Sequence, residues 1–140
     1  MQTFLPYPNF NDSARVLDDK RLGNQCYREC KIIVTGGWKH HPVSKMWKGH
    51  EYNLCNYAIS LAIELFLRNR EVVGARWYNW FLNKRNEFKK TPDPYWLGSE
   101  KLHASHRSNL LRKDQEWYGK FGWVEPNDLE YFWPEQSNKH

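Results

Sequence analysis

Residues 44–70 read SKMWKGHEYNLCNYAISLAIELFLRNR, and this stretch decides the fold. Its apolar side chains recur at steps of three and four residues, which is the spacing of one face of an α-helix. The pattern predicts a helix from about Ser44 to Arg70 with a buried stripe along one side. The stripe contains Trp47, Leu54, Tyr57, Ala58, Leu61, Ala62, Leu65 and Phe66.

The chain before this helix divides into an arm and a second helical stretch. Residues 1–10 contain two prolines and are expected to form an extended arm. Asp12 or Ser13 can cap a helix that runs to about Val34, and Asp18-Asp19 offers a second cap if the helix is interrupted there. The glycine pair that follows is expected to end it.

Two more helices are expected after residue 70. One runs from about Val73 to Lys89, and another from a cap at Ser99 to about Leu111. After Asp114 the chain is rich in aromatic and turn residues, and no strand pattern is present. The sequence therefore predicts a mainly α fold, with residues 1–140 forming a single compact helical domain that ends in an aromatic, irregular segment. The side chains expected to point inward from the helix after residue 70 are Trp77, Trp80 and Phe81.

The composition argues against membrane and secreted classes. The mean hydropathy is −0.90 and 26% of residues are charged, and no apolar run approaches the roughly 20 residues that span a bilayer. The first residues lack the basic and apolar regions of a secretory signal. Three cysteines, an odd number without framework spacing, favour reduced thiols. These features predict a cytoplasmic protein, and a monomer is expected.

Charge and aromatic content together favour a nucleic-acid partner. The net charge is +5, and a basic surface attracts polyanions. Aromatic residues reach 16% and include eight tryptophans. Some of these rings must pack the core, but rings interleaved with basic side chains also hold phosphates and unstacked bases. The segment from Trp117 to Trp123 is the candidate for this role.

One cluster, residues 18–29, could carry catalysis. On a helix Arg21, Gln25 and Arg28 fall along one side, and Glu29 lies about 100° from Arg28. A carboxylate among arginines stays ionised and oriented, which suits proton abstraction beside a clamped phosphate. The same spacing also fits a solvated, salt-bridged helix face, and spacing alone favours that alternative.

Histidines form two further clusters. One contains His41 and Lys45, and the other contains His103, His106 and Arg107. A pair of histidines three residues apart can hold a metal, grip a phosphate together with an arginine, or shuttle protons. No carboxylate or cysteine stands beside His103 and His106 at ligand spacing, so no metal site is predicted.

Several blocks of sequence occur together from Thr3 to about Pro134. The blocks are Thr3-Phe4-Leu5-Pro6-Tyr7-Pro8, Leu17-Asp18-Asp19-Lys20-Arg21-Leu22-Gly23-Asn24-Gln25, Tyr27-Arg28-Glu29, His41-Pro42-Val43-Ser44-Lys45-Met46-Trp47, Trp96-Leu97-Gly98 and His103-Ala104-Ser105-His106-Arg107-Ser108-Asn109. Together they resemble the pyrimidine-dimer DNA glycosylase family, whose members are common in phages and bacteria, and the combination of blocks is specific.

The resemblance implies a helical DNA glycosylase with abasic-site lyase activity that acts on double-stranded DNA. In that family an amine attacks the sugar C1′ and expels the base, and a glutamate assists strand cleavage; no metal or other cofactor is required. Carried over, Glu29 is the catalytic carboxylate, with His106 as a further candidate. The nucleophile is the α-amine of Met1, which the large side chain of Gln2 protects from removal, or else Lys20. The expected DNA-binding residues are Arg21, Gln25, Arg28, His41, Lys45, His103, Arg107, Trp117 and Trp123.

Two other functions remain open at this point. A non-catalytic DNA-binding module of the same fold would keep the basic surface without the chemistry. A metal-dependent nuclease would use the histidine clusters. The sequence does not specify which damaged or modified pyrimidine is the substrate.

Overall fold

The computed structural model describes residues 2–134, and in that range it consists of helices and loops without a strand. The mainly α fold is therefore confirmed. None of the helices in the described range is long and apolar enough to cross a bilayer. The elements are α1 (Phe10–Val16), α2 (Asp19–Asn24), the π-helix η1 (Gln25–Cys30), α3 (Lys31–Val34), α4 (Pro42–Trp47), α5 (Glu51–Leu67), α6 (Glu71–Arg85), α7 (Glu100–Lys113), α8 (Gln115–Tyr118) and the 3₁₀ helix η2 (Gly119–Phe121).

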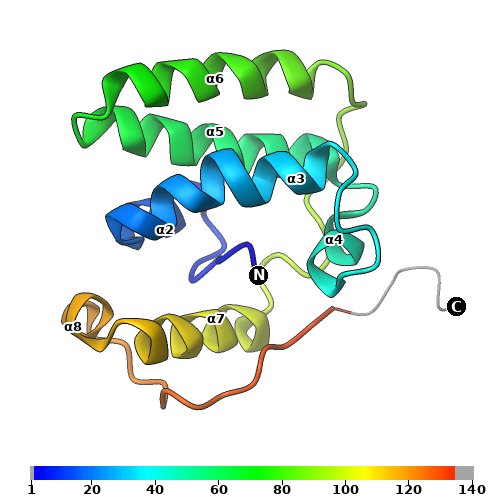
Figure 1. The fold of residues 1–140 in the computed structure, drawn as a ribbon. Coiled ribbons are helices and arrows are strands. Elements are labelled where there is room, and N and C mark those ends of the chain that lie inside the picture. Colours follow the sequence, from blue (N-terminus) through cyan, green and yellow to red (C-terminus); the bar gives the residue numbers. More distant parts are fainter. Residues whose placement is uncertain (1, 135–140) are drawn as a thin grey trace, which may run out of the picture.

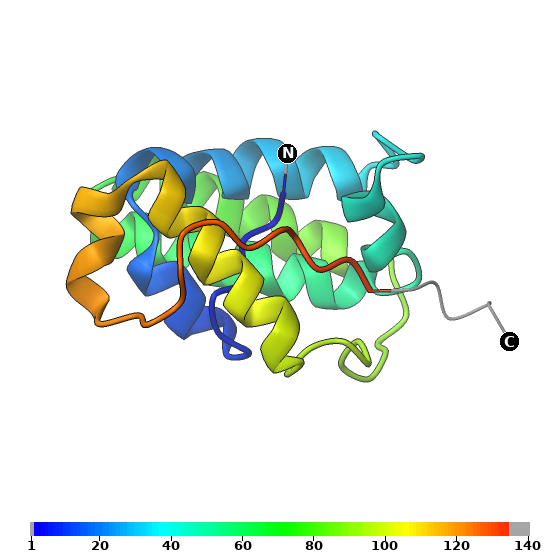
Figure 2. The same cartoon turned by 90° about the horizontal axis from the view of Figure 1, so that it is seen from below.

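The helices lie in layers (Figure 1). α5 and α6 form an antiparallel hairpin, and the continuous run α2–η1–α3 packs on α5. α7 lies on the other side of the molecule. The N-terminal arm, residues 2–8, runs between the α2–α3 run and α7, and the last described residues cross over α7 (Figures 1 and 2). The arm is thus enclosed by segments far from it in sequence.

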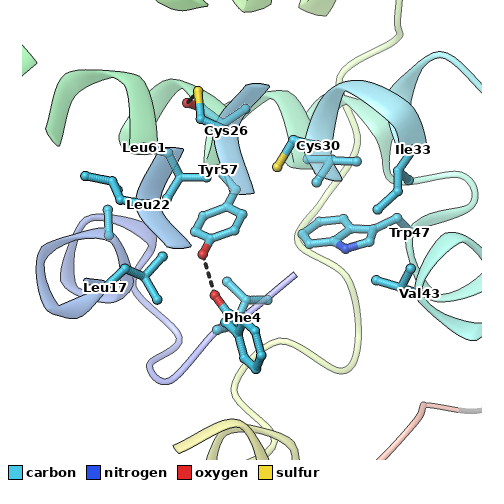
Figure 3. Packing of buried hydrophobic residues seen from close by; sticks show 14 of the residues in the cluster. Phe4, Leu17, Leu22, Cys26, Cys30, Ile33, Val43, Trp47, Tyr57 and Leu61 are labelled. Atoms are coloured by element: carbon cyan, nitrogen blue, oxygen red, sulfur yellow. Dashed lines mark hydrogen bonds between the residues drawn. The ribbon is translucent and has the colours of Figure 1, made fainter. Parts of the chain in front are cut away.

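The core lies where the arm meets α5 and η1. Tyr57 of α5 is fully buried, and its hydroxyl donates to the carbonyl oxygen of Phe4 (Figure 3). Trp47 is also fully buried, and its indole Nε1 donates to Thr3 Oγ1 at 2.9 Å. These two bonds fix the arm to the core. The cysteines are buried and free, and burial raises the pKa of Cys26 to about 12, so it stays a thiol.

The prediction of one helix over 44–70 is wrong at its start. Residues 48–50 separate α4 from α5, and Gly49 has a φ of +84°, a left-handed conformation that glycine adopts without a steric penalty. α4 begins instead at Pro42, where the ring fixes a helical φ. The His41 side chain accepts from the Val43 N–H at 3.0 Å and so caps this helix.

The helical stretch that was expected before Val34 is interrupted between Val16 and Asp19, where the Asp18-Asp19 pair offered a second cap. The Asp18 side chain accepts from the Arg21 N–H and caps α2, which confirms the second cap. The cap of α1 was predicted wrongly, because Asn9 holds that position and accepts from the Asp12 N–H at 3.0 Å. The stretch ends after Val34, as expected, where Gly36 has a φ of +91°.

The helices after residue 70 lie close to their predicted ranges. Ser99 caps α7, and its side chain accepts from the Leu102 N–H. In α6, Phe81 is fully buried, whereas Trp77 and Trp80 are half-buried against the core. The aromatic segment after Asp114 is partly helical, because α8 and η2 occupy it before the chain becomes irregular.

Candidate active site

Glu29 is a buried carboxylate on η1. Its residue is 6% exposed, and its Oε1 lies 2.6 Å from Nη1 of the half-exposed Arg28. The Arg28 guanidinium also lies 5.5 Å from the centre of the Trp38 ring. A charge-assisted bond of this kind fixes the orientation of the carboxylate. Glu29 is therefore held as an acceptor on the wall of a small pocket.

The pocket beside Glu29, the Glu29 pocket, has a volume of ≈ 180 Å³. Four separate segments form its wall: the N-terminal arm, the α2–η1 run, the end of α7 and the last described segment. Lys20, Arg21, Gln25 and Glu29 of the predicted site meet here. The full lining is Gln2, Phe4, Lys20, Arg21, Asn24, Gln25, Glu29, Lys113 and Tyr131.

Gln25 joins the arm to the helix that carries Glu29. Its Nε2 donates to the Gln2 carbonyl oxygen at 2.7 Å, and its Oε1 accepts from the Phe4 N–H at 2.8 Å. Gln25 is buried, so these bonds replace water at both ends of the amide. Gln2 is 2% exposed and is the residue bonded to Met1, which itself lies outside the described residues.

Positive charge gathers on one side of the Glu29 pocket. Arg21 Nη1 lies 3.1 Å from Asp18 Oδ1, which orients the guanidinium. Burial opposes ionisation of Asp18, but hydrogen bonds from Tyr118 and Arg21 outweigh burial and hold its pKa below the ordinary value. Burial lowers the pKa of Lys113, and the charges of Arg21 and Arg112 lower it further. A phosphate beside this pocket would meet both arginine and lysine.

The histidines of α7 hold the N-terminal arm rather than lining the pocket. His103 Nδ1 lies 2.7 Å from the Leu5 carbonyl oxygen, and its Nε2 accepts from the Gly98 N–H at 2.9 Å. His106 Nδ1 accepts from the Leu5 N–H at 2.9 Å. Burial lowers the pKa of His106 to about 3, and the charge of His103 adds to this effect, so His106 is neutral at physiological pH. Both polar groups of Leu5 are thereby satisfied.

Arg107 extends the same contact along the arm. Its Nη1 donates to the Pro6 carbonyl oxygen at 2.7 Å, and its Nη2 pairs with Glu100 and, at 2.8 Å, with Glu125. The guanidinium is therefore paired and mostly covered. We call His103, His106 and Arg107 the α7 clasp.

The hydroxyl and amide side chains of α7 hold the last described segment. Ser108 Oγ donates to the Pro126 carbonyl oxygen at 2.5 Å and accepts from the Leu129 N–H at 3.0 Å. Asn109 Nδ2 donates to the Leu129 carbonyl oxygen at 3.1 Å. This packing places Tyr131 beside the Glu29 pocket.

The remaining predicted residues lie away from the Glu29 pocket. Lys45 lines a separate hollow between α3 and α4, and the His41 ring meets Trp133 edge-on. Trp117 Nε1 donates to the Val16 carbonyl oxygen at 2.8 Å, and Lys120 lies over its ring. Trp123 Nε1 donates to Tyr7 Oη at 2.7 Å. Both rings are half-buried, so they also stabilise the fold.

Sequence reasoning missed five residues of the pocket wall: Gln2, Phe4, Asn24, Lys113 and Tyr131. Asn24 lies within the cluster already considered and could have been included from its place beside Gln25. Lys113 follows Arg112 at the end of α7, where basic residues commonly complement the helix dipole, so nothing local marked it. Gln2 and Tyr131 reach the pocket only through tertiary packing.

Among residues 2–134, no group of three or more histidine, cysteine, aspartate or glutamate side chains is arranged to hold a metal ion. Both ring nitrogens of His103 and one of His106 already have protein partners. The histidine pair on α7 therefore presents one ring nitrogen, His106 Nε2, that has no protein partner and is buried.

The structure thus combines a helical fold with a pocket that is lined by a buried carboxylate, a lysine and an arginine. The chain belongs to the pyrimidine dimer DNA glycosylase family, whose family model matches residues 1–79. Membership of this family implies that the protein is a glycosylase and that its substrate is DNA. The match includes the arm, α2 and η1, whereas the α7 clasp lies beyond it. No curated protein and no solved structure matches the chain.

Proposed function

We propose that this protein is a bifunctional DNA glycosylase and abasic-site lyase that acts on damaged or modified pyrimidines in double-stranded DNA. The observation that carries the proposal is the burial of Glu29 in a pocket shared with Lys20, Arg21 and the arm residue Gln2. These residues all lie in the part of the chain that matches the family.

The first step is displacement of the base by an amine. The lone pair of a neutral amine forms a bond to the sugar C1′, while the C1′–N bond breaks and the base leaves with the electron pair and takes up a proton. The amine is the α-amine of Met1, next to Gln2, or Nζ of Lys20. An α-amine has an ordinary pKa of about 7.7–8.0, against about 10.4 for a lysine side chain. Near neutral pH a larger fraction of the α-amine is therefore in the neutral, nucleophilic form.

The second step is strand cleavage. Loss of a proton from the nitrogen and opening of the sugar ring give a Schiff base, and Glu29 then removes a C2′ proton as the 3′ phosphate leaves. Water finally hydrolyses the imine and frees the amine. Arg28 orients the Glu29 carboxylate for the proton transfer, and Arg21 holds a phosphate next to the reacting sugar.

Borohydride trapping tests this proposal. Reduction of the Schiff base should give a stable covalent adduct between the protein and abasic or photodimer DNA, and peptide mass spectrometry should locate it on Met1 or Lys20. Strand cleavage should survive strong chelation. Tight DNA binding without adduct or cleavage would instead support a non-catalytic binding module, and cleavage abolished by chelation would support a metal-dependent nuclease.

A further inference from the structure

A second hollow lies between the end of α3 and α4, and we call it the α3–α4 hollow. Its volume is ≈ 540 Å³, larger than that of the Glu29 pocket. Lys39, Lys45 and Lys48 line it together with His40, whereas Glu51 is the one acidic residue of the lining. The lining therefore carries a clear excess of positive charge.

The three lysines have no carboxylate partner in the part of the chain that the structure describes. The ion pairs found among residues 2–134 use other cations. All three lysines are exposed, and Glu51 Oε2 accepts from the Gly49 N–H at 3.2 Å instead. Ammonium groups gathered without anions attract a polyanion and release its counterions when it binds.

The backbone that lines the hollow leaves room for a phosphate group to approach closely. Gly36 has a φ of +91°, and a Cβ built at this position would meet nothing within 4 Å. This part of the lining is thus bare backbone that faces open space. A phosphate can approach such a turn more closely than it can approach a side-chain-covered surface.

The α3–α4 hollow lies along the same helical run as the Glu29 pocket. Glu29 lines the pocket and Ile33 lines the hollow, and these residues lie four positions apart on one continuous helical run. Residues at this spacing share a face and lie about 6 Å apart along the helix axis. Arg28, which pairs with Glu29, also lies 5.5 Å from the ring centre of Trp38, the residue before Lys39, so one duplex that passes along this run can contact both sites.

We infer that the α3–α4 hollow is a second docking site for the DNA backbone, in which Lys39, Lys45 and Lys48 bind phosphodiester groups of the same duplex whose damaged sugar is held at the Glu29 pocket. The inference rests on the proposed function for the position of the damaged sugar. Its ligand is the phosphodiester oxygen, so binding there is independent of base sequence. Such a site orients the duplex before chemistry takes place.

The test compares two full-length variants that lose the same charge. The first carries Lys39→Gln, Lys45→Gln and Lys48→Gln. The matched control carries Arg76→Gln, Lys89→Gln and Lys90→Gln, which remove three exposed cations on and after α6. Both variants should keep the helical circular dichroism and melting temperature of the wild type, because none of the six side chains is buried.

Affinity for abasic duplex DNA is measured by fluorescence anisotropy at several salt concentrations. Each lost phosphate contact lowers the slope of log K against log salt by about 0.9, so the first variant should lose about 2 to 3 in slope and the control less than 1. Single neutral methylphosphonates, placed in turn at positions on either side of the abasic site, should weaken wild-type binding at the positions that contact the α3–α4 hollow. The first variant should be insensitive to those substitutions.

Equal slopes for the two triple variants, or equal sensitivity to methylphosphonates, would overturn the inference. Borohydride adduct formation at saturating protein separates this outcome from failure of the proposed function. The first variant should still form the adduct, because none of its substitutions touches the Glu29 pocket. Wild-type protein that shows the salt and methylphosphonate effects but forms no adduct would retain the docking site and lose the proposed chemistry.

Discussion

At the residue scale, the burial of the Glu29 carboxylate depends on its ion pair with Arg28. A buried carboxylate without a partner is costly, and the bond from Arg28 offsets this cost while leaving the other carboxylate oxygen for a substrate. The pairing of Glu29 with an arginine could be predicted from local spacing. The burial of Glu29 could not, because Phe4 and Tyr131 line the pocket from segments distant in sequence.

Replacing Glu29 by glutamine should remove chemistry and keep DNA binding. Glutamine has nearly the same shape but cannot accept the C2′ proton, and a general base typically contributes 10²- to 10⁴-fold. We therefore expect strand cleavage by Glu29→Gln to fall at least about 100-fold, with DNA affinity changed less than about threefold. Single-turnover cleavage and anisotropy measure the two quantities.

Glu87→Gln is the matched control for this substitution. Glu87 pairs with Lys84 on the exposed end of α6 and lies outside the Glu29 pocket, so this variant should cleave at the wild-type rate. Full cleavage activity in Glu29→Gln would show that another group takes the proton.

At the scale of elements, η1 is the feature that helical periodicity does not reveal. A π-helix holds one residue more per turn than an α-helix, and such turns are frequent at functional sites. Within η1, Gln25 contacts the arm and Glu29 lines the pocket, while Cys26 and Cys30 stay in the core. A hydrophobic pattern read at 3.6 residues per turn indicates only a continuous helix.

Deletion of Tyr27 should therefore be tolerated better than deletion of a residue from an α-helical turn. Removal of one residue from η1 converts it to an α turn and leaves Leu22 and Ile33 facing the core. Deletion of the exposed Lys31 instead rotates the residues after it by about 100° and turns Ile33 out. We expect deletion of Tyr27 to cost about 1–3 kcal/mol in urea unfolding and deletion of Lys31 to prevent folding.

Adduct formation gives a second measure of the Tyr27 deletion. Glu29 should keep its direction into the pocket, since the extra residue is what the π turn accommodates, and borohydride trapping should still succeed. Equal loss of stability in the two deletion variants would show that η1 has no special tolerance.

The helix α7 could be predicted from the sequence, but the contacts of its side chains could not. Its helical range and Ser99 cap were predicted from local signals, and its histidines were singled out as site residues. Their observed partners, Leu5 and Pro6, lie about 100 residues away along the chain, and local spacing gives no information on such contacts. The α7 clasp acts on the site through the arm that it holds.

The α7 clasp should make stability depend on pH. The pKa of His106 is about 3 in the folded protein, below its ordinary value of 6.5, so the unfolded chain binds more protons between these values. The contribution of neutral His106 is complete above about pH 6.5 and is lost as the pH falls toward 3. Since a pKa difference of one corresponds to about 1.4 kcal/mol, the loss amounts to a few kcal/mol.

Urea unfolding between pH 4 and pH 7.5 measures this dependence. His106→Asn supplies an amide oxygen near the position of Nδ1 and does not titrate, so its stability should fall less steeply with acid. Some dependence should remain, because burial also lowers the pKa of His103. An unchanged slope in His106→Asn would assign the acid sensitivity to other groups.

At the scale of the whole molecule, the scaffold and the site occupy different layers. The α5–α6 hairpin supports the α2–η1–α3 run (Figure 1). The lining of the Glu29 pocket contains no residue of α6. The helical patterns predicted both helices of the hairpin, because each buries a stripe of its own. The break before α5 was not predicted, since Gly49 needs its left-handed conformation only to join α4 and α5 at the observed angle.

Gly74 sets the distance between the two helices of the hairpin. A Cβ at this position would lie 2.7 Å from the Phe66 backbone nitrogen and 2.8 Å from the Ala62 carbonyl oxygen. Alanine gains about 1 kcal/mol in helix propensity over glycine, but overpacking against backbone atoms costs about 1–3 kcal/mol. Gly74→Ala should therefore lower the free energy of unfolding by about 1 kcal/mol.

Ala75→Gly, at an exposed position of the same helix, measures the propensity difference without the close contact. A stabilised Gly74→Ala variant would mean that α5 and α6 separate at little cost. Because the Glu29 pocket is built from other segments, borohydride adduct formation by Gly74→Ala at 25 °C should equal that of the wild type. A parallel loss of adduct and stability would instead show that the hairpin transmits strain through α5 to η1, and that the two layers act as one unit.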